Sequence, residues 1–296
     1  MNKFFLLFVL LFIVGSGLQA QKLVEAIDLG VKTRNDVPPE FGFLMPNPVQ
    51  AYKIVYETYD TKGNTVRASG LAVFPTREGF AFPLAVYQHG TVSIESQVPS
   101  NLPAEAAIGL VFSSNNYVVI MPDYLGFGEN AEDLHPYVHA ASEASAAVDM
   151  LFAVREFAAQ ENFALNDQLF ITGYSQGGHA AAALHQVLEA DYSEEFTVTG
   201  SAPLSGPYNI SGALVDGVLN DEPYNFPQYL ANTFVSYNLV YELYDSTEQM
   251  FKQPYAGMID QFIGGDIELS GLGTMLNAQL TADYGASFNT TDLILR

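Results

Sequence analysis

The 296-residue sequence contains no cysteine and no tryptophan, and it has only 11 Lys and Arg residues. The absence of cysteine excludes a disulfide framework, a thiolate zinc site, an iron–sulfur cluster and a lipid-modified N-terminal cysteine. The 33 Asp and Glu residues leave a formal net charge of −22. Because affinity for nucleic acids comes mainly from Lys and Arg, this balance excludes a nucleic-acid partner. His and carboxylate residues are not clustered at ligand spacing, so we expect no bound metal and no cofactor.

Hydrophobic residues, by contrast, make up 49% of the chain and charged residues 15%. A folded chain of this length buries roughly 75% of the surface that its unfolded form exposes. The composition therefore predicts a folded protein with one large domain or two small ones, and it excludes disorder as the default state.

Residues 1–20 have the layout of a secretory signal peptide. Lys3 precedes an apolar run from Phe4 to Val14, and small residues then lead to Ala20. We expect cleavage after Ala20 and a protein exported to the periplasm or secreted. The alternative is an uncleaved anchor, but the run is shorter than the roughly 18–20 residues that span a membrane. No later segment has spanning length, so we expect no stable membrane anchor after cleavage.

The next part of the chain alternates between predicted strands and helices. After a lead-in with four prolines, the pattern predicts strands over 52–59, 66–74, 83–88, 117–121, 168–172 and 196–202. The first two form a hairpin around the turn at 62–64. Helices are predicted over 104–112, 140–160 and from the turn at 173–178 to about Glu189. A hairpin followed by strand–helix alternation predicts an α/β fold with a mostly parallel sheet and helices on both faces.

From Ser211 onward the pattern changes. Residues 226–244 and 246–262 are predicted helices rich in aromatic residues, and no clear strand follows. We therefore expect a core over 21–210 and a helical cap or lid insertion over 211–296. Apolar acyl chains bind in pockets lined by such side chains, although the same residues also suit the cap's own core.

The sequence Gly173-Tyr-Ser-Gln-Gly-Gly178 lies between a predicted buried strand and a predicted helix. It matches the G-x-S-x-G nucleophile elbow, with Ser175 at the apex. Side chains at 173 and 177 would clash across the tight turn, and Gly178 lets the following helix approach the sheet. This geometry exposes the Ser175 hydroxyl and directs the first amides of the helix at a reacting carbonyl.

A nucleophile elbow needs two backbone N–H groups as an oxyanion hole. The first comes from the residue after the nucleophile, here Gln176, and the second from the loop after an earlier strand. That loop is His89-Gly90-Thr91, in which Thr91 is the preferred donor and Gly90 the alternative. We expect His89 to shape this loop, and Asp123 to organise its own loop by accepting backbone hydrogen bonds.

Four segments together resemble one family of secreted enzymes. They are Val86-Tyr-Gln-His-Gly-Thr91, Pro122-Asp-Tyr-Leu-Gly-Phe-Gly128, His135-Pro-Tyr137 and Gly173-Tyr-Ser-Gln-Gly-Gly178. In this order and spacing they resemble the secretory lipase family of α/β-hydrolases over residues 50–210. The segment Phe251-Lys-Gln-Pro-Tyr255 is similar to that family's cap. The resemblance implies hydrolysis of carboxylic esters, with small-molecule esters or lipids as substrates and a Ser, an Asp and a His as catalytic groups.

The chain departs from this pattern after the nucleophile. The triad acid and base of the fold follow the Ser, but none of the five histidines lies beyond the predicted elbow helix. His179 and His185 lie on that helix and are expected to be packing or surface residues, and His135 is a weak substitute base. Asp216, Asp260 and Asp266 are more typical of solvated surface carboxylates. The sequence thus identifies neither the triad acid nor the His.

We expect that the chain stops before the last two strands of the sheet, which leaves the strand at 196–202 as an unpaired edge. Such a chain by itself would be a poor catalyst. Two alternatives to an incomplete ester hydrolase stay open. One is a non-catalytic acyl-binding protein that keeps the pocket without the triad. The other is a serine peptidase of the same fold, because G-x-S-x-G-G also occurs in prolyl-oligopeptidase-like enzymes.

Overall fold

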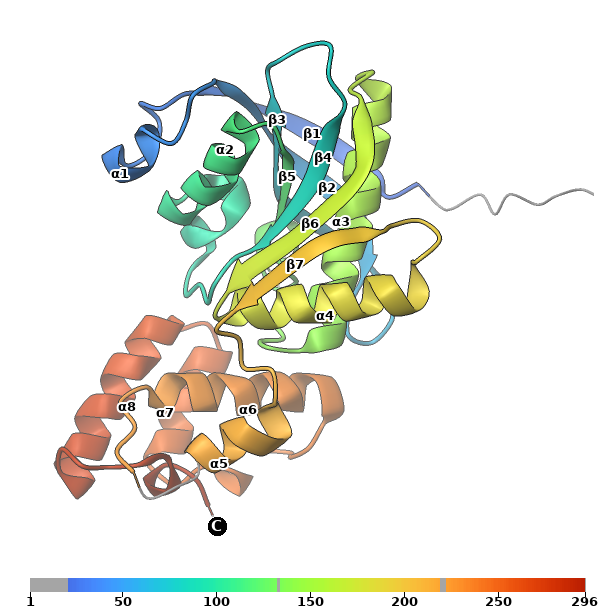
Figure 1. Cartoon of the computed structure of the whole chain (residues 1–296). Helices are drawn as coiled ribbons and strands as arrows, with labels where there is room; N and C mark the ends of the chain where they lie inside the picture. The colour runs from blue at the N-terminus through green and yellow to red at the C-terminus, as the bar shows by residue number, and fades with distance from the viewer. Residues whose placement is uncertain (1–20, 132–133, 219–221, 296) are drawn as a thin grey trace, which may run out of the picture.

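The computed structural model describes residues 21–131, 134–218 and 222–295, so the expected signal peptide lies outside the described residues. Figure 1 shows a twisted sheet flanked by helices and, beyond one end of its strands, a separate group of helices. In the part of the chain that is described, no helix combines the length and the apolar character needed to cross a membrane.

The sheet has seven strands in the order β1-β2-β3-β5-β4-β6-β7. Their bounds are β1 Leu23–Lys32, β2 Val49–Tyr59, β3 Thr65–Pro75, β4 Phe82–Gln88, β5 Val118–Pro122, β6 Leu165–Tyr174 and β7 Val198–Leu204. Strands β1, β2, β3 and β5 pair antiparallel, whereas β5, β4, β6 and β7 pair parallel. The carboxyl ends of the parallel strands meet at one edge of the sheet, which is where ligands bind in such folds.

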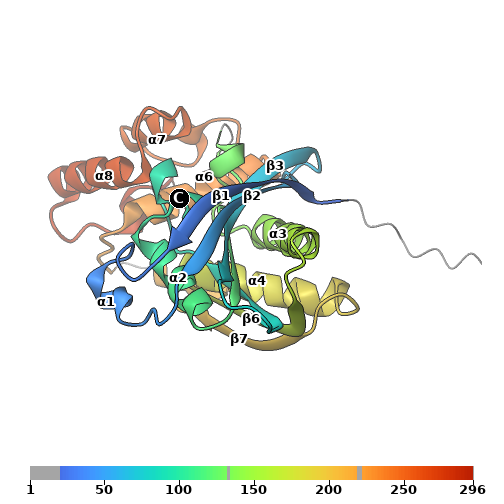
Figure 2. The same cartoon turned by 90° about the horizontal axis from the view of Figure 1, so that it is seen from above.

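Helices cover both faces of the sheet, as Figure 2 shows. On one face lie α3 (Ala140–Gln160) and α4 (Gln176–Asp191), and their apolar sides bury Leu151 and Leu184 against strand residues such as Ile120. On the other face lies α2 (Ala107–Ser114), which packs Leu110 against Val119, with the short α1 (Pro39–Gly42) beside it. Every residue of β5 is buried, because this central strand has helices on both sides.

The described residues of 210–295, here called the helical part, contain a π-helical turn (Ile210–Leu214), α5 (Val215–Val218), α6 (Pro227–Tyr241), α7 (Tyr255–Ile263) and α8 (Leu269–Tyr284). These helices pack around an apolar cluster of their own, which includes Val235, Phe251, Tyr255, Leu272 and Leu276. Figure 1 places the helical part beyond the carboxyl ends of β6 and β7.

The predicted strands and helices of the sheet are confirmed, including the hairpin of β2 and β3 around Gly63. The lead-in, in contrast, contains a strand that the sequence did not reveal. Only the first residue of β1 is fully buried, so the strand lacks a clear alternation of apolar residues. A side chain of α3 binds the start of this strand, because the Glu156 carboxylate accepts hydrogen bonds from the N–H groups of Lys22 and Leu23.

The predicted helix over 246–262 is wrong. A 3-10 turn at Thr247–Gln249 is followed by a break, and α7 begins only at Tyr255. Pro254 cannot donate a hydrogen bond inside a helix, and Phe251 instead forms a β-bridge with Ile294. Helix α8 was also missed. Strand β7, by contrast, lies at the edge of the sheet as expected and pairs only with β6 within the described ranges.

Candidate active site

Ser175 occupies the sharp turn between β6 and α4. Its backbone has φ 58° and ψ −120°, a conformation that is strained for any residue other than glycine. The Ser175 N–H donates to the carbonyl oxygen of Leu204 at the end of β7 (3.0 Å). The residue is partly exposed at the mouth of α4, and its hydroxyl makes no hydrogen bond within the described ranges. The turn therefore presents an available hydroxyl above the parallel strands.

The elbow glycines allow the backbone of the β6–α4 turn to lie close to the backbone at the ends of β4 and β7. A Cβ at Gly173 would collide with the carbonyl oxygen of Gly177, and a Cβ at Gly177 would lie 2.6 Å from the carbonyl oxygen of His89. A Cβ at Gly178 would collide with the carbonyl oxygen of Leu204. These positions hold the β6–α4 turn against the ends of β4 and β7, as the sequence predicted for steric reasons.

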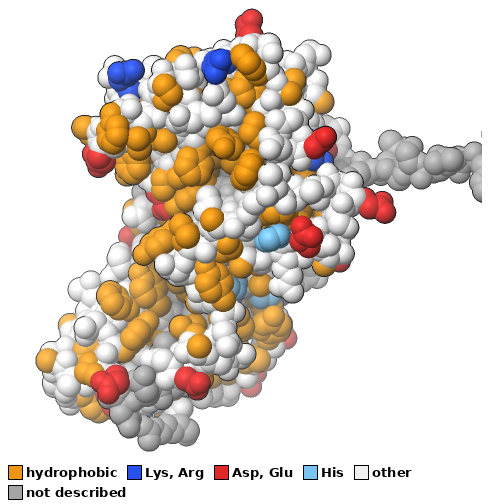
Figure 3. Space-filling model, in the orientation of Figure 1, with side chains coloured by type: hydrophobic (Ala, Val, Ile, Leu, Met, Phe, Trp, Pro, Cys, Tyr) orange, Lys and Arg blue, Asp and Glu red, His pale blue; other side chains and the backbone are white. Residues whose placement is uncertain are grey.

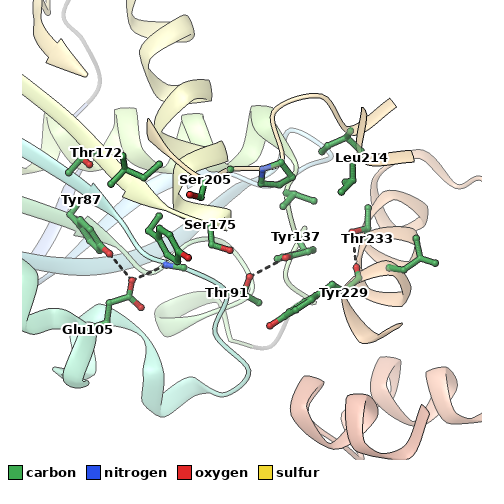
Figure 4. A pocket seen from close by; sticks show the side chains of 18 of the residues that line it. Tyr87, Thr91, Glu105, Tyr137, Thr172, Ser175, Ser205, Leu214, Tyr229 and Thr233 are labelled. Carbon is green, nitrogen blue, oxygen red and sulfur yellow. Dashed lines mark hydrogen bonds between the residues drawn. The ribbon is translucent and has the colours of Figure 1, made fainter. Parts of the chain in front are cut away.

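The loop after β4 faces Ser175 in the same cavity (Figure 4). The N–H of Gly90 donates to Glu105 Oε1 at 3.0 Å, and the same oxygen accepts the hydroxyl of Tyr87 at 2.9 Å. The Thr91 N–H has no hydrogen-bond partner in the ranges that the structure describes, while the Thr91 hydroxyl bonds that of Tyr137 at 3.1 Å. Of the two candidates in this loop, Thr91 is therefore the N–H left available to a ligand.

The two predicted loop residues, His89 and Asp123, are both buried. His89 is buried, with Nδ1 2.7 Å from the carbonyl oxygen of Gly90 and its ring against that of Tyr124. Asp123 is also buried, and its carboxylate accepts the Ser100 N–H (2.9 Å) and the Ser69 hydroxyl (2.6 Å). Burial raises the pKa of Asp123, and these hydrogen bonds oppose the shift. His89 is thus bonded to the loop that carries Gly90, and Asp123 joins its own loop to Ser69 and Ser100.

Gln176, the residue after Ser175, joins a buried polar network that sequence reasoning missed. As the first residue of α4, it has a backbone N–H without an intrahelical partner. Its side-chain amide nitrogen lies 2.7 Å from His135 Nε2 and 2.9 Å from Glu143 Oε1. The other carboxylate oxygen of Glu143 lies 2.7 Å from His179 Nδ1. The sequence did offer one signal of this network. Glu143 lies four residues before Ala147, on the apolar side of α3, and a carboxylate buried on that side needs a polar partner.

His135 is held as a neutral ring. Its Nδ1 lies 2.7 Å from the carbonyl oxygen of Leu125, so Nδ1 carries the proton and Nε2 accepts from Gln176. The ring packs against those of Tyr124 and Phe127, and this burial lowers its pKa to about 4. Nε2 is therefore occupied by Gln176 and makes no hydrogen bond with the Ser175 hydroxyl.

None of the other histidines contacts the Ser175 hydroxyl either. His139 bonds Ser142 and Tyr241, and His185 lies at the surface 3.8 Å from Glu189. His179 is a buried partner of Glu143, so it is neither a surface residue nor a purely apolar contact. The acid candidates Asp216, Asp260 and Asp266 are exposed in the helical part. Within the described ranges, therefore, the structure brings no triad acid and no triad His to Ser175.

A cavity of about 1210 Å³ lies between the sheet and the helical part, with Ser175, Thr91 and Glu105 on its wall. Its lining is mainly apolar and aromatic, and includes Phe112, Tyr137, Leu214, Tyr224, Tyr229, Leu230 and Phe234. Glu105 is the only Asp, Glu, Lys or Arg side chain among these lining residues. Figure 3 shows hydrophobic side chains gathered where the two parts meet. Such a cavity suits an apolar ligand that places a polar group near Ser175.

Comparison with solved structures places this arrangement in a known family. A Legionella pneumophila protein that is provisionally described as a hydrolase is 30% identical, with a TM-score of 0.80. The alignment covers 93% of this chain and 73% of that protein. The chain belongs to the α/β-hydrolase family. The rice cell wall degrading esterase LipA from Xanthomonas oryzae is 27% identical to this α/β-hydrolase, with a TM-score of 0.77, and the alignment covers 92% and 72% of the two chains.

Two further comparisons are less specific. Lipase A from Candida antarctica shares the fold at 15% identity, with a TM-score of 0.64 over 93% of this α/β-hydrolase and 60% of the lipase. Residues 107–192 match the model of the prolyl oligopeptidase family, a range that contains the elbow and α4. A search of the curated proteins found no match. The chain is thus a hydrolase by family, with esterases and lipases among its structural neighbours.

Proposed function

We propose that this protein is an exported serine ester hydrolase that transfers an acyl group through Ser175. The strained Ser175 backbone at the head of α4, on the wall of a largely apolar cavity, is the observation that carries this proposal. A helix N-terminus favours negative charge, so the turn suits the oxyanion that forms when a hydroxyl attacks an ester.

In the proposed reaction, the Ser175 oxygen attacks the ester carbonyl carbon after a base removes the hydroxyl proton. The backbone N–H groups of Gln176 and Thr91 donate to the oxyanion of the tetrahedral intermediate. Collapse of the intermediate expels the alcohol, which takes up a proton, and leaves an acyl-Ser175 ester. Water then attacks this ester, and the carboxylic acid leaves. In the described ranges, no histidine hydrogen-bonds the Ser175 hydroxyl.

The cavity supports an ester with a sizeable apolar group as substrate. Its walls come from both parts of the molecule, with Tyr87 and Phe112 on the sheet side and Tyr229 and Phe234 on the helical side. We therefore propose that the segment expected as a cap, residues 211–296, to which the helical part belongs, covers the core formed by residues 21–210. Glu105 adds a negative charge to the wall, which favours neutral substrates over anionic ones.

The layout of residues 1–20 supports export to the periplasm or beyond the cell. One structural neighbour, LipA from Xanthomonas oryzae, is described as a rice cell wall degrading esterase. The measurement is N-terminal sequencing of the protein recovered from the periplasm and from the medium, and the proposal expects a start at Gln21. An N-terminus at Met1 would contradict it.

The activity is tested on the full natural protein with p-nitrophenyl acetate and p-nitrophenyl decanoate. Ser175→Ala is expected to lower kcat by about 10⁵- to 10⁶-fold, the scale of loss when a catalytic nucleophile is removed. It is also expected to abolish covalent labelling by a fluorophosphonate. Ser145→Ala is the matched control, because Ser145 lies on α3 and its hydroxyl bonds only the carbonyl oxygen of Ser142. Equal rates for Ser175→Ala and Ser145→Ala would exclude Ser175 as the nucleophile.

The same panel tests the two alternatives. The match to the prolyl oligopeptidase family favours a peptidase, which would cleave peptide p-nitroanilides faster than esters. The absence of a histidine at Ser175 within the described ranges favours a non-catalytic binding protein. Such a protein would bind apolar esters in the cavity and release them unchanged, whether or not Ser175 is replaced.

A further inference from the structure

One short segment, residues 134–139, contacts the helical part and both proposed oxyanion donors. It connects the loop after β5 to the start of α3. On the helical side, Leu134 packs against the apolar cluster of the helical part. Three hydrogen bonds then join the segment to consecutive turns of α6. Ser236 Oγ donates to the carbonyl oxygen of His135 (3.0 Å), and the Tyr237 hydroxyl donates to that of Val138 (3.3 Å).

The third of these bonds joins His139 Nε2 to the Tyr241 hydroxyl, 3.2 Å apart. Ser236, which bonds His135, is fully buried, so this hydrogen bond of the contact is shielded from water, whereas Tyr241 is exposed. Helix α6 therefore rests on the segment through polar contacts with defined directions, in addition to apolar packing.

The opposite side of the segment faces the oxyanion hole. Figure 4 shows the Tyr137 hydroxyl joined to that of Thr91, at 3.1 Å. His135 Nε2 accepts a hydrogen bond from the side chain of Gln176, at 2.7 Å. Each proposed oxyanion N–H thus belongs to a residue whose side chain is held by the segment, and the two contacts come from residues only two positions apart.

The backbone of the segment is itself strained. Val138 has φ 48° although it is β-branched, a conformation that such residues rarely adopt. Its carbonyl oxygen is the one that accepts the Tyr237 hydroxyl, and its side chain is buried. A strained conformation persists only where its surroundings hold it, and here the surroundings include α6. The position of α6 therefore helps to determine the backbone conformation of residues 134–139.

We propose that His135 and Tyr137 are positioning residues that couple the seating of α6 to the two oxyanion donors, Gln176 and Thr91. The proposal rests on the proposed function for its effect on catalysis. Its structural content, a coupling between α6 and the two donor loops, is independent of turnover. Substrate that fills the cavity under α6 would thereby set the geometry of the oxyanion hole as it binds.

The kinetic test uses substitutions that remove a single oxygen. Tyr137→Phe removes the bond to Thr91, and Ser236→Ala removes the bond between α6 and His135. Both are expected to lower kcat for p-nitrophenyl acetate about three- to tenfold with little change in KM, the scale of one hydrogen bond. Tyr244→Phe is the matched control, because the Tyr244 hydroxyl bonds the carbonyl oxygen of Phe234 inside the helical part. It is expected to leave kcat unchanged.

A double-mutant cycle distinguishes coupling from two unrelated losses. If α6 acts through the segment, Ser236→Ala combined with Tyr137→Phe loses less than the product of the single effects. Thr91→Val should reproduce the loss of Tyr137→Phe, and Thr91→Ser, which keeps the hydroxyl, should restore kcat. Multiplicative effects, or effects confined to KM, would overturn the proposal.

Amide hydrogen exchange gives a readout that needs no activity. Ser236→Ala is expected to accelerate exchange in the peptides that contain residues 89–92 and 175–179 at least threefold, although Ser236 lies in α6. Tyr244→Phe should leave those peptides unchanged. Unchanged exchange in Ser236→Ala at an unaltered melting temperature would overturn the coupling. If the coupling holds while Ser175→Ala keeps full esterase activity, the proposed function fails and the coupling stands.

Discussion

The substitution Gly177→Ala tests the geometry of the elbow most directly. A Cβ at this position would lie 2.6 Å from the carbonyl oxygen of His89 and would also collide with that of Gln88. Both obstacles are backbone atoms at the end of β4, so no side-chain rotation relieves the clash. Either α4 or the loop that carries Thr91 must move, and the proposed oxyanion hole changes with it.

The size of the effect follows from the contacts. Overpacking in a well-packed core costs about 1–3 kcal/mol, and two rigid backbone partners place Gly177→Ala at about 3 kcal/mol. For a chain of this length the entropy of unfolding is about 0.6 kcal/mol/K, so that loss lowers the melting temperature by about 5 °C. The displaced oxyanion donors should also lower kcat by about 100-fold, the scale for loss of one such donor.

Gly271→Ala is the matched control. Gly271 lies in α8, and a Cβ there would meet only the Cβ of Ile267 at 3.7 Å, an ordinary van der Waals contact. Because alanine favours the helix over glycine, this variant should gain about 0.5–1 kcal/mol. Thermal unfolding followed by circular dichroism, with p-nitrophenyl ester hydrolysis, compares the two variants. The reasoning is refuted if Gly177→Ala is as stable and as active as Gly271→Ala.

Two further predictions concern His135 and Glu105. The folded protein holds the pKa of His135 at about 4, below the ordinary value of 6.5, so the unfolded chain binds a proton there first as the pH falls. The contribution of His135 to the free energy of unfolding is therefore complete above about pH 6.5, and about 3 kcal/mol of it is lost by pH 4. Urea titrations at the two pH values measure this loss. The variant His135→Phe, which has no group to protonate at this position, should not show it. Glu105→Gln should keep kcat for p-nitrophenyl esters within about threefold, because Oε1 alone accepts the hydrogen bonds from Tyr87 and Gly90 and the amide oxygen can replace it. Glu105→Leu removes both acceptors and should lower kcat by about tenfold in the same assay.

Much of the site was predictable because its chemistry depends on local geometry. The steric need for glycine at 173 and 177, with a strand before and a helix after, was enough to predict the turn at Ser175. The loop at 89–91 was predictable from its position, since it follows a buried strand that pairs in parallel with β6, so both strands end at the same edge of the sheet.

The residues that support the site were not predictable in the same way. Glu105 lies in a short turn before α2, and only the fold brings its carboxylate to Gly90. Tyr137 and Ser236 have no sequence pattern that relates them to Thr91 or Gln176. Their roles depend on hydrogen bonds between segments up to about one hundred residues apart.

By itself, then, the sequence determined the α/β alternation, the apex serine and the two backbone segments that face it, because periodicity and glycine sterics act over a few residues. The tertiary structure decided which N–H of the loop is available, that His135 and His179 belong to a buried network, and which residues of the helical part line the cavity. Burial and hydrogen-bond partners are properties of distant segments brought into contact, and no local pattern encodes them.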